Sequence, residues 1–231
     1  MHHQFVFYAN PEQIQGSRIC FDAFESRHIN VLRLQKGAEI RVVDGKGRLF
    51  TVQLDSYCDN QWRGFIHDSR IHESSAPAPL SLALPCLKGE HWGIALEAAC
   101  EIGIHEIFLV DYQNSAVHWT EARLEKARRK ALEALKQSGG SHLTHVSGPF
   151  SLTELITGWK SAILVADSSG GECESVPESA LLIIGPEAGL HEQEIEALKK
   201  RKSVFIRFGD RRLRSEISAI VAVSQMILKM K

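Results

Sequence analysis

Two stretches decide the fold, LLIIGPEAGL at residues 181–190 and SVFIRFGDRRLRSE at residues 203–216. Each runs an apolar strand into a glycine-containing turn, and apolar residues at helical spacing follow each turn. The run at 181–184 is typical of a strand that is buried on both faces. In parallel sheets, ligands bind beyond the carboxyl ends of the strands, where glycine lets the backbone approach closely. The two turns therefore predict one pocket at a sheet edge.

The composition is that of a globular protein. The chain has 231 residues, of which 44% are hydrophobic and 24% are charged, and its net charge is −1. This balance argues against a protein that coats nucleic acid through overall positive charge. The sequence has no apolar run of about 18 residues, and its start lacks the basic-then-apolar order of a signal peptide. We therefore expect a cytoplasmic protein with no membrane partner.

A Ser/Ala/Pro stretch at 73–79 predicts a linker between two domains. Before it, at 1–72, short β-prone segments and a hairpin signal at 44–47 predict a small β-barrel. After it, at 80–231, strands alternate with helices, so the fold class is α/β, with a mostly parallel sheet covered by helices on both faces. The expected strands are 4–8, 18–21, 39–43, 49–54, 62–67, 80–84, 106–110, 162–166, 181–184 and 204–208, and the expected helices are about 91–102, 121–137, 191–200 and 213–228.

Several catalytic and binding motifs are absent from the sequence. There is no GxGxxG after an early strand and no GxxxxGK[ST], so dinucleotide and P-loop sites lack their phosphate cradle. There is also no GxSxG elbow, and no cysteine sits in a strand-to-helix turn beside a basic residue. The five cysteines form no CxxC pair, and His142 and His145 have no third ligand nearby. We expect reduced thiols and no metal.

The two opening stretches resemble the motifs of a known family. LLIIGPEAGLHEQEI at 181–195 is similar to the GPEGG-then-acidic motif, and RFGDRRLRSEIS at 207–218 to the LG-x-x-x-LR-x-ET-A motif, of the RsmE family of SPOUT methyltransferases. The resemblance covers almost the whole chain. Further similar segments are HINVLRLQKG at 28–37, VVDGKG at 42–47, Lys88, LEAACEIGI at 96–104 and EALKQSG at 133–139.

This resemblance implies an RNA-binding PUA-like β-barrel followed by a SPOUT domain, whose C-terminal chain is threaded into a trefoil knot. It implies a homodimer with S-adenosylmethionine as cofactor, acting on N3 of a uridine in 16S ribosomal RNA, either free or within the small ribosomal subunit. An adenosyl ligand has no polyphosphate and needs loop backbone and apolar walls instead. The missing phosphate loop agrees with this expectation.

The family's functional residues carry over to matching positions in this chain. Arg214 is expected to hold the uracil carbonyls or an adjacent phosphate, and Glu216 to orient Arg214 or to accept the N3 proton. Outside such a role, both would simply mark a helix start, and the other basic residues would be solvated surface. The expected cofactor-binding residues are Leu164, Gly185, Glu187, Gly189, Phe208, Gly209 and Leu213, and the expected RNA-binding residues are Arg33, Lys88, Arg128 and Arg129.

Departures from the family pattern leave the substrate less determined than the cofactor. In some positions where the family has a cation or an aromatic residue expected to face the substrate, this chain has another residue. Two further changes, Ala188 and Ile217, fall inside the two C-terminal motifs. One alternative is a SPOUT methyltransferase that acts on another nucleotide or on a ribose oxygen, and another is a catalytically weak RNA-binding or ribosome-assembly module. Retention of Arg214 and Glu216 favours an enzyme. The departures are Ala98, Lys126, Ala127, Gly140, Ala188 and Ile217.

Overall fold

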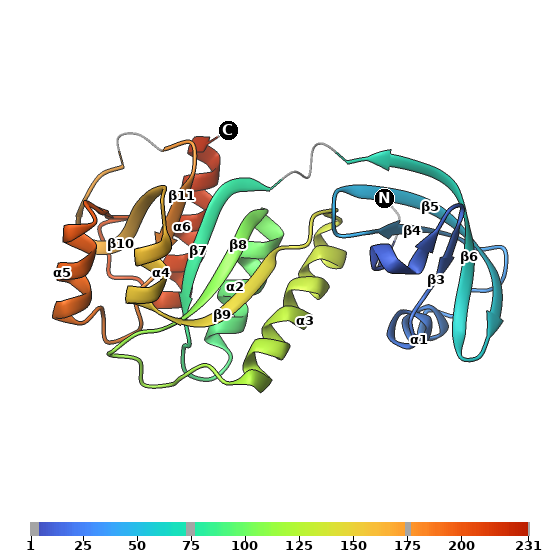
Figure 1. The fold of residues 1–231 in the computed structure, drawn as a ribbon, viewed down its shortest axis with the longest axis horizontal. Helices are drawn as coiled ribbons and strands as arrows, with labels where there is room; N and C mark the ends of the chain where they lie inside the picture. The colour runs from blue at the N-terminus through green and yellow to red at the C-terminus, as the bar shows by residue number, and fades with distance from the viewer. Residues whose placement is uncertain (1–4, 73–76, 174–176, 231) are drawn as a thin grey trace. The chain divides into compact units, whose positions relative to one another are not determined.

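The computed structural model describes residues 5–72, 77–173 and 177–230, and the chain forms two compact units (Figure 1). The first unit takes in the chain up to residue 76 together with Leu135–Leu143, and the second takes in Pro77–Ala134 and the chain from Thr144 onward. Of the predicted linker at 73–79, residues 73–76 lie outside the described residues. Its last two residues belong to strand β7.

The first unit is built on a curled six-stranded sheet with the order β1-β4-β5-β6-β3-β2. β1 runs parallel to β4, and the other neighbouring strands are antiparallel. Phe7, Ile29, Val52 and Trp62 are among the residues of its core. This small β domain agrees with the prediction, although among the described strands the edges β1 and β2 do not pair to close a barrel. The strands are β1 (Val6–Tyr8), β2 (Ile14–Gln15), β3 (Arg18–Cys20), β4 (Glu39–Val43), β5 (Arg48–Cys58) and β6 (Gln61–Ile71).

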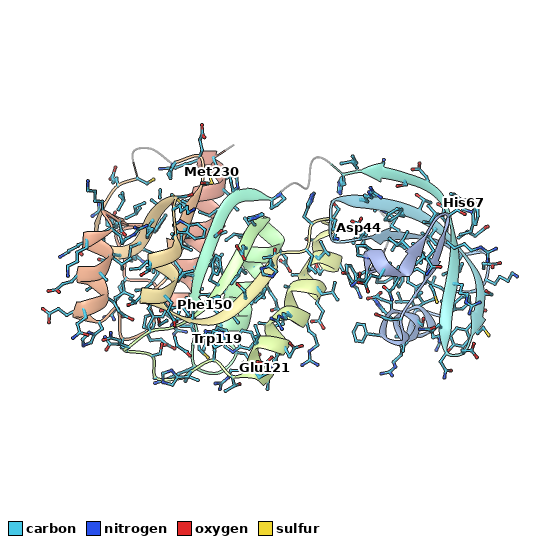
Figure 2. The ribbon with its side chains drawn as sticks, in the orientation of Figure 1. Asp44, His67, Trp119, Glu121, Phe150 and Met230 are labelled. Atoms are coloured by element: carbon cyan, nitrogen blue, oxygen red, sulfur yellow. The ribbon has the colours of Figure 1, made fainter. Side chains whose placement is uncertain are left out.

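The turn between β4 and β5 is the predicted hairpin, and Figure 2 labels its first residue, Asp44. Oδ1 of Asp44 accepts hydrogen bonds from the backbone N–H groups of Lys46, at 2.8 Å, and Arg48, at 3.0 Å. Gly45 and Gly47 have φ values of 72° and 99°. Residues with a side chain rarely adopt these values, so the two glycines allow the turn.

Helix α1 (Ala23–Val31) was not predicted, because its apolar residues do not form one buried stripe. Phe24 is exposed, whereas the neighbouring Glu25 is buried. The side chain of Asp22 caps the helix by accepting a hydrogen bond from the N–H of Glu25 at 2.8 Å. The Glu25 carboxylate in turn pairs with Nζ of Lys136 within the same unit. The ion pair and the cap therefore help to stabilise this helix. Neither leaves a repeating apolar pattern in the sequence from which the helix could be predicted.

The second unit holds a six-stranded sheet with the order β12-β10-β11-β7-β8-β9, in which every neighbouring pair is parallel. This confirms the parallel sheet predicted for 80–231. β11 lies between β10 and β7, so Leu182 pairs with Leu164 on one side and with Leu82 on the other. The strands are β7 (Ala78–Pro85), β8 (Ile104–Asp111), β9 (His145–Ser151), β10 (Ala162–Gly171), β11 (Ala180–Ile183) and β12 (Val204–Ile206).

Helices cover both faces of this sheet (Figure 1). Ala83, Val165 and Ile183 share one core cluster with apolar residues of α4 and α5. On the other side, α2 and α6 pack against each other and against β7. Within the described ranges, no helix is both long and apolar enough to cross a membrane. The helices are α2 (His91–Ile102), α3 (Glu121–Ser138), α4 (Leu152–Gly158), α5 (Glu192–Lys200) and α6 (Ser215–Met230).

Strand β9 and helix α4 were not predicted either. β9 contains Gly148 and Pro149, two residues that are unfavourable in strands. α4 has only seven residues, but its start carries a readable signal. The Ser151 side chain accepts a hydrogen bond from the Glu154 N–H at 3.2 Å, and the Glu154 carboxylate accepts one from the Ser151 N–H at 2.8 Å. This reciprocal capping box could have located the helix.

A buried carboxylate ties the loop after β8 to the start of α5. Glu194 is buried, and its Oε1 accepts a hydrogen bond from the backbone N–H of Gln113 at 3.0 Å. Its Oε2 accepts a second from the backbone N–H of His191 at 2.8 Å. The segment 185–190 immediately precedes this anchor. Glu194 therefore stabilises one end of the glycine-containing turn.

We predict that Glu194→Ala lowers the free energy of unfolding by about 1–3 kcal/mol, because two backbone donors lose a buried acceptor. Glu192→Ala is the matched control, since Glu192 is an exposed carboxylate in the same helical turn. Glu192→Ala should lower the free energy of unfolding by less than about 1 kcal/mol. Urea unfolding of the three proteins measures the difference. Equal losses for the two variants would contradict the anchoring role.

Candidate active site

A cavity of about 280 Å³ lies in the second unit, at the carboxyl edge of the parallel sheet. The second half of β10 and the loops that follow β11 and β12 form it, because parallel strands end at the same edge of a sheet. Its wall contains three glycines and the apolar residues Ile184, Leu190, Ile206 and Phe208. It also contains four charged residues, Asp167, Glu187, Arg211 and Arg212. The two sequence stretches that predicted a pocket therefore do meet in one.

Glycine shapes this cavity at two positions. Gly189 has a φ of 79° and Gly209 a φ of 145°, and both line the cavity. The N–H of Gly189 donates to the carbonyl of Pro186 at 2.9 Å, and the Asn114 side chain donates to the carbonyl of Gly189 at 3.3 Å. Gly185 differs, because a Cβ there would meet only Leu190, at an ordinary 3.6 Å or more.

A second cavity, of about 460 Å³, adjoins the first. It carries charged and titratable side chains from three parts of the unit: the segment after β7, the β11 loop and the start of α6. Glu187, Arg212, Leu213 and Ser215 line both cavities, so these residues form the wall between them. The other lining residues are Lys88, His91, Arg214 and Glu216.

Glu216 lies at the base of the second cavity and pairs with a histidine. Its side chain is 9% exposed, and its Oε1 lies 3.2 Å from Nδ1 of His91, whose side chain is 46% exposed. Arg214 precedes α6, where its carbonyl accepts a hydrogen bond from the N–H of Ser218 at 2.7 Å. The Arg214 guanidinium is exposed and has no ion-pair partner in the described part of the chain. The Glu216 carboxylate thus contacts His91, and no ion pair joins it to Arg214, which it was expected either to orient or to assist by accepting the N3 proton.

The loop after β7 is joined to the β11 loop by one hydrogen bond. The backbone N–H of Lys88 donates to Oε1 of Glu187 at 3.0 Å. Glu187 follows Pro186 in the first opening stretch, and Lys88 lies three residues before His91. This hydrogen bond joins the β11 loop, which contributes Glu187 to both cavities, to the loop after β7, which contributes Lys88 to the second cavity.

The structure brings most predicted site residues together. Arg214, Glu216 and Lys88 line the second cavity. Leu164 is the exception: it is 2% exposed within β10 and lines neither cavity, because its side chain is enclosed by the sheet core. Sequence reasoning missed His91, which carried no signal beyond its position at a helix start. The predicted residues that line the first cavity are Gly185, Glu187, Gly189, Phe208, Gly209 and Leu213.

The departures from the family pattern have simple structural settings. Ala188 is exposed and does not have a positive φ, so its extra methyl group is tolerated. Ile217 is 42% exposed. Ala127 is fully buried, and Lys126 pairs with Glu90 at 2.7 Å. Ala98 and Gly140 are partly buried.

The remaining predicted RNA-binding cations are exposed on other surfaces. Arg33 belongs to the first unit and has a φ of 56°. Arg128 and Arg129 lie on α3, where Arg128 pairs with Glu125 at 2.6 Å. None of these three arginines lines either cavity of the second unit.

The first unit has a basic cavity of its own, which the sequence did not reveal. It measures about 320 Å³, and its lining includes Arg18, Lys36, Arg63 and Phe65, together with Asp55, whose carboxylate lies 3.8 Å from Nζ of Lys36. Phe65 is 42% exposed. Cations beside an exposed aromatic ring suit phosphate and a stacked base. The pairing of β3 with β6 brings Arg18 beside Phe65, from segments far apart in the sequence.

No cysteine lines either of the two cavities. Burial raises the pKa of the Cys86 thiol to about 11 and that of the Cys100 thiol to about 12. Both therefore stay protonated at neutral pH, whereas nucleophilic cysteines react as thiolates. The described residues also contain no cluster of three or more His, Cys, Asp or Glu side chains suited to a metal ion.

Comparison with protein families decides which class of protein carries this site. The chain matches the RNA methyltransferase domain over residues 74–227. It belongs to the RNA methyltransferase family. The RNA methyltransferase PUA domain also matches, over residues 22–55, which lie in the curled β unit. RNA is therefore the substrate class of this family member.

Individual relatives of this RNA methyltransferase carry more specific names. It is 25% identical to the ribosomal RNA small subunit methyltransferase E of Mycobacterium bovis over 94% of this chain and 89% of that protein. It is 26% identical to the protein of the same name from Synechocystis, over 94% and 75%. The fold is similar to that of ribosomal RNA small subunit methyltransferase E from Neisseria gonorrhoeae bound to S-adenosyl methionine, with a TM-score of 0.89, 22% identity and 97% of each chain covered.

We predict that Gly189→Ala lowers the free energy of unfolding by about 1–2 kcal/mol, because a residue with a Cβ is strained at its positive φ. Gly185→Ala is the matched control in the same loop, since no positive φ and no close contact oppose its Cβ. Chemical denaturation of both variants tests the difference. A larger loss for Gly185→Ala would show that the strain has been assigned to the wrong glycine.

Proposed function

We propose that this RNA methyltransferase uses S-adenosylmethionine to methylate N3 of a uridine in 16S ribosomal RNA of the small subunit. The observation that carries the proposal is the pair of adjoining cavities, one built from glycine-containing loops and the other from charged side chains. The ribosomal target draws support from the names of relatives that align along nearly the whole chain. The RsmE-type motifs support the uridine N3 position.

The first cavity suits an adenosyl ligand. Its loops offer backbone groups at Gly185, Gly189 and Gly209, together with the side chains of Phe208 and Leu213. Backbone donors and acceptors beside apolar walls are what a purine ring and a ribose require. We assign these residues to cofactor binding. The bound cofactor supplies an electrophilic methyl group.

The second cavity suits the acceptor base. The Arg214 guanidinium, which has no ion-pair partner among the described residues, is available to bind a uracil carbonyl or a neighbouring phosphate, and Lys88 adds a second cation. Uracil N3 carries a proton at neutral pH, so negative charge develops on the carbonyl oxygens as that proton leaves. Fixing N3 at attack distance from the first cavity supplies much of the rate. Glu216 belongs to the groups that handle the proton.

RNA contacts beyond the reacting base need further cations. We assign this role to Arg33, Arg128 and Arg129, and to the basic cavity of the first unit. Such contacts neutralise phosphates and set the position of the RNA. A cytoplasmic location follows from the ribosomal target.

A homodimer and a trefoil knot complete the proposal. α2 and α6 pack side by side, and Ile94, Ile217 and Leu228 on these helices are exposed, with Leu228 at 75%. Exposed apolar side chains on neighbouring helices are typical of an interface. The knot remains a prediction from the RsmE resemblance.

The direct test is methylation of small ribosomal subunits from cells that lack this gene. Purified protein and S-adenosylmethionine should produce N3-methyluridine in 16S RNA, detected by mass spectrometry of nucleosides. A methylated ribose or a different base would replace this proposal with another methyltransferase activity. Absence of any product, together with no cofactor binding by calorimetry, would indicate an RNA-binding module.

We predict that Arg214→Ala lowers kcat by about 10²-fold or more, because the developing charge loses a donor. Cofactor affinity should remain nearly unchanged, since Arg214 lines only the second cavity. Arg214→Lys should recover part of the lost activity. Lysine restores the positive charge but not the planar arrangement of N–H donors that a guanidinium presents. Lys199→Ala, which removes an exposed cation from α5, is the control. Full activity of Arg214→Ala would overturn the assignment.

A further inference from the structure

We propose that His91 is the general base that removes the N3 proton and that Glu216 is the positioning residue that holds its imidazole. This inference rests on the proposed function, because it assumes an acceptor base in the second cavity. It assigns the proton to a residue for which neither the motifs nor the family match gave a role. The contact between Nδ1 of His91 and Oε1 of Glu216, at 3.2 Å, is its starting point.

Exposure separates the roles of the two residues. The Glu216 side chain is 9% exposed, whereas that of His91 is 46% exposed. Both line the same cavity, so the imidazole is the member of the pair that an incoming base reaches more easily. A general base has to lie within hydrogen-bond reach of the proton that it takes. His91 meets this requirement better than the carboxylate beneath it.

The contact also favours one tautomer. A proton on Nδ1, the ring nitrogen that lies 3.2 Å from the Glu216 carboxylate, leaves the free electron pair on Nε2. Nε2 has no hydrogen-bond partner among the side chains that the structure describes. A carboxylate behind an imidazole fixes the ring orientation and stabilises the imidazolium that forms. The arrangement is thus that of an oriented base.

The backbone holds both residues in place. His91 is the first residue of α2, and Glu216 is the second residue of α6. α2 and α6 pack against each other. Groups on two packed helices are positioned more accurately than groups on loops.

The proton transfer is balanced within this set of groups. The N3–H bond breaks, its electron pair stays on the ring nitrogen, and the proton forms a bond to Nε2 of His91. The negative charge spreads to the two carbonyl oxygens of the uracil, near the guanidinium of Arg214. The imidazolium carries the proton until it passes to water after the product leaves. The deprotonated nitrogen is then the nucleophile toward the methyl group.

Several charged groups set the electrostatic environment of His91. From the loop after β7 comes Lys88, from the β11 loop Glu187, from the segment before α6 Arg212 and Arg214, and from α6 Glu216. Glu90, the residue before His91, is paired with Lys126 of α3. Protonation of His91 in the free enzyme would remove the acceptor. The rate should therefore fall on the acid side of the pH profile.

The kinetic test compares His91→Gln with the wild-type protein on unmodified small subunits. We expect kcat to fall by about 10²–10⁴-fold, which is the usual contribution of a general base. The acid limb of the pH profile should disappear, while calorimetry gives an unchanged affinity for S-adenosylmethionine. The ratio of wild-type kcat to His91→Gln kcat should decrease at high pH, because uracil N3 then loses its proton to solvent and needs no general base. His105→Gln is the control, because His105 is an exposed histidine that lines neither cavity.

Two further measurements separate a base from a structural residue. Added imidazole should restore part of the activity of His91→Ala but none to His91→Gln, whose longer side chain fills the space. In the protein without ligands, ¹⁵N NMR should show His91 protonated at Nδ1, and Glu216→Ala should shift the proton toward Nε2. An Nε2-protonated ring in the wild type would contradict the proposal.

The outcomes also distinguish this inference from the proposed function. An active wild type with full activity in His91→Gln would reject His91 as the base and return that role to Glu216. A rate that still falls at low pH in His91→Gln, as in the wild type, would also reject His91 as the base. A wild type that forms no N3-methyluridine would instead reject the proposed function itself.

Discussion

Burial of β11 on both faces is the constraint on which the site depends. All four residues of this strand are buried, and hydrogen bonding to β10 and β7 holds them in register. The chain can therefore leave β11 only at the carboxyl edge, where β10, β12 and β7 also end. Gly185–Leu190 emerges beside 207–214 and beside Lys88 for this reason. Apolar burial in the sheet thus fixes where the two cavities form.

The two cavities differ in what builds them. Loop backbone shapes the first, so a change such as Ala188, which adds a methyl group in an exposed position, leaves the cavity intact. Side chains build the second, and a single residue there changes the chemistry. The pair formed by His91 and Glu216 is an example, because it converts a buried carboxylate into support for an accessible imidazole.

Apolar periodicity predicted the parallel sheet, and turn residues predicted the hairpin at 44–47 and the pocket. It failed for α1 and α4, where Asp22 and Ser151 start helices through side-chain capping rather than through an apolar stripe. The site was predictable wherever a residue lay inside a motif. His91 was not, because its role comes from the packing of α2 on α6, two segments more than 100 residues apart. Leu164 was expected at the cofactor site from its motif position alone, but it is buried within β10 and lines neither cavity.

The most direct measurement is a crystal structure of the protein with S-adenosylmethionine. Our account predicts the adenosyl group between the β11 loop and residues 206–213, with the methyl group directed across the wall of Glu187 and Leu213 toward His91 and Arg214. Cofactor density outside this cavity would contradict the account. So would a methyl group that points away from the second cavity, because the two cavities would then not form one active site.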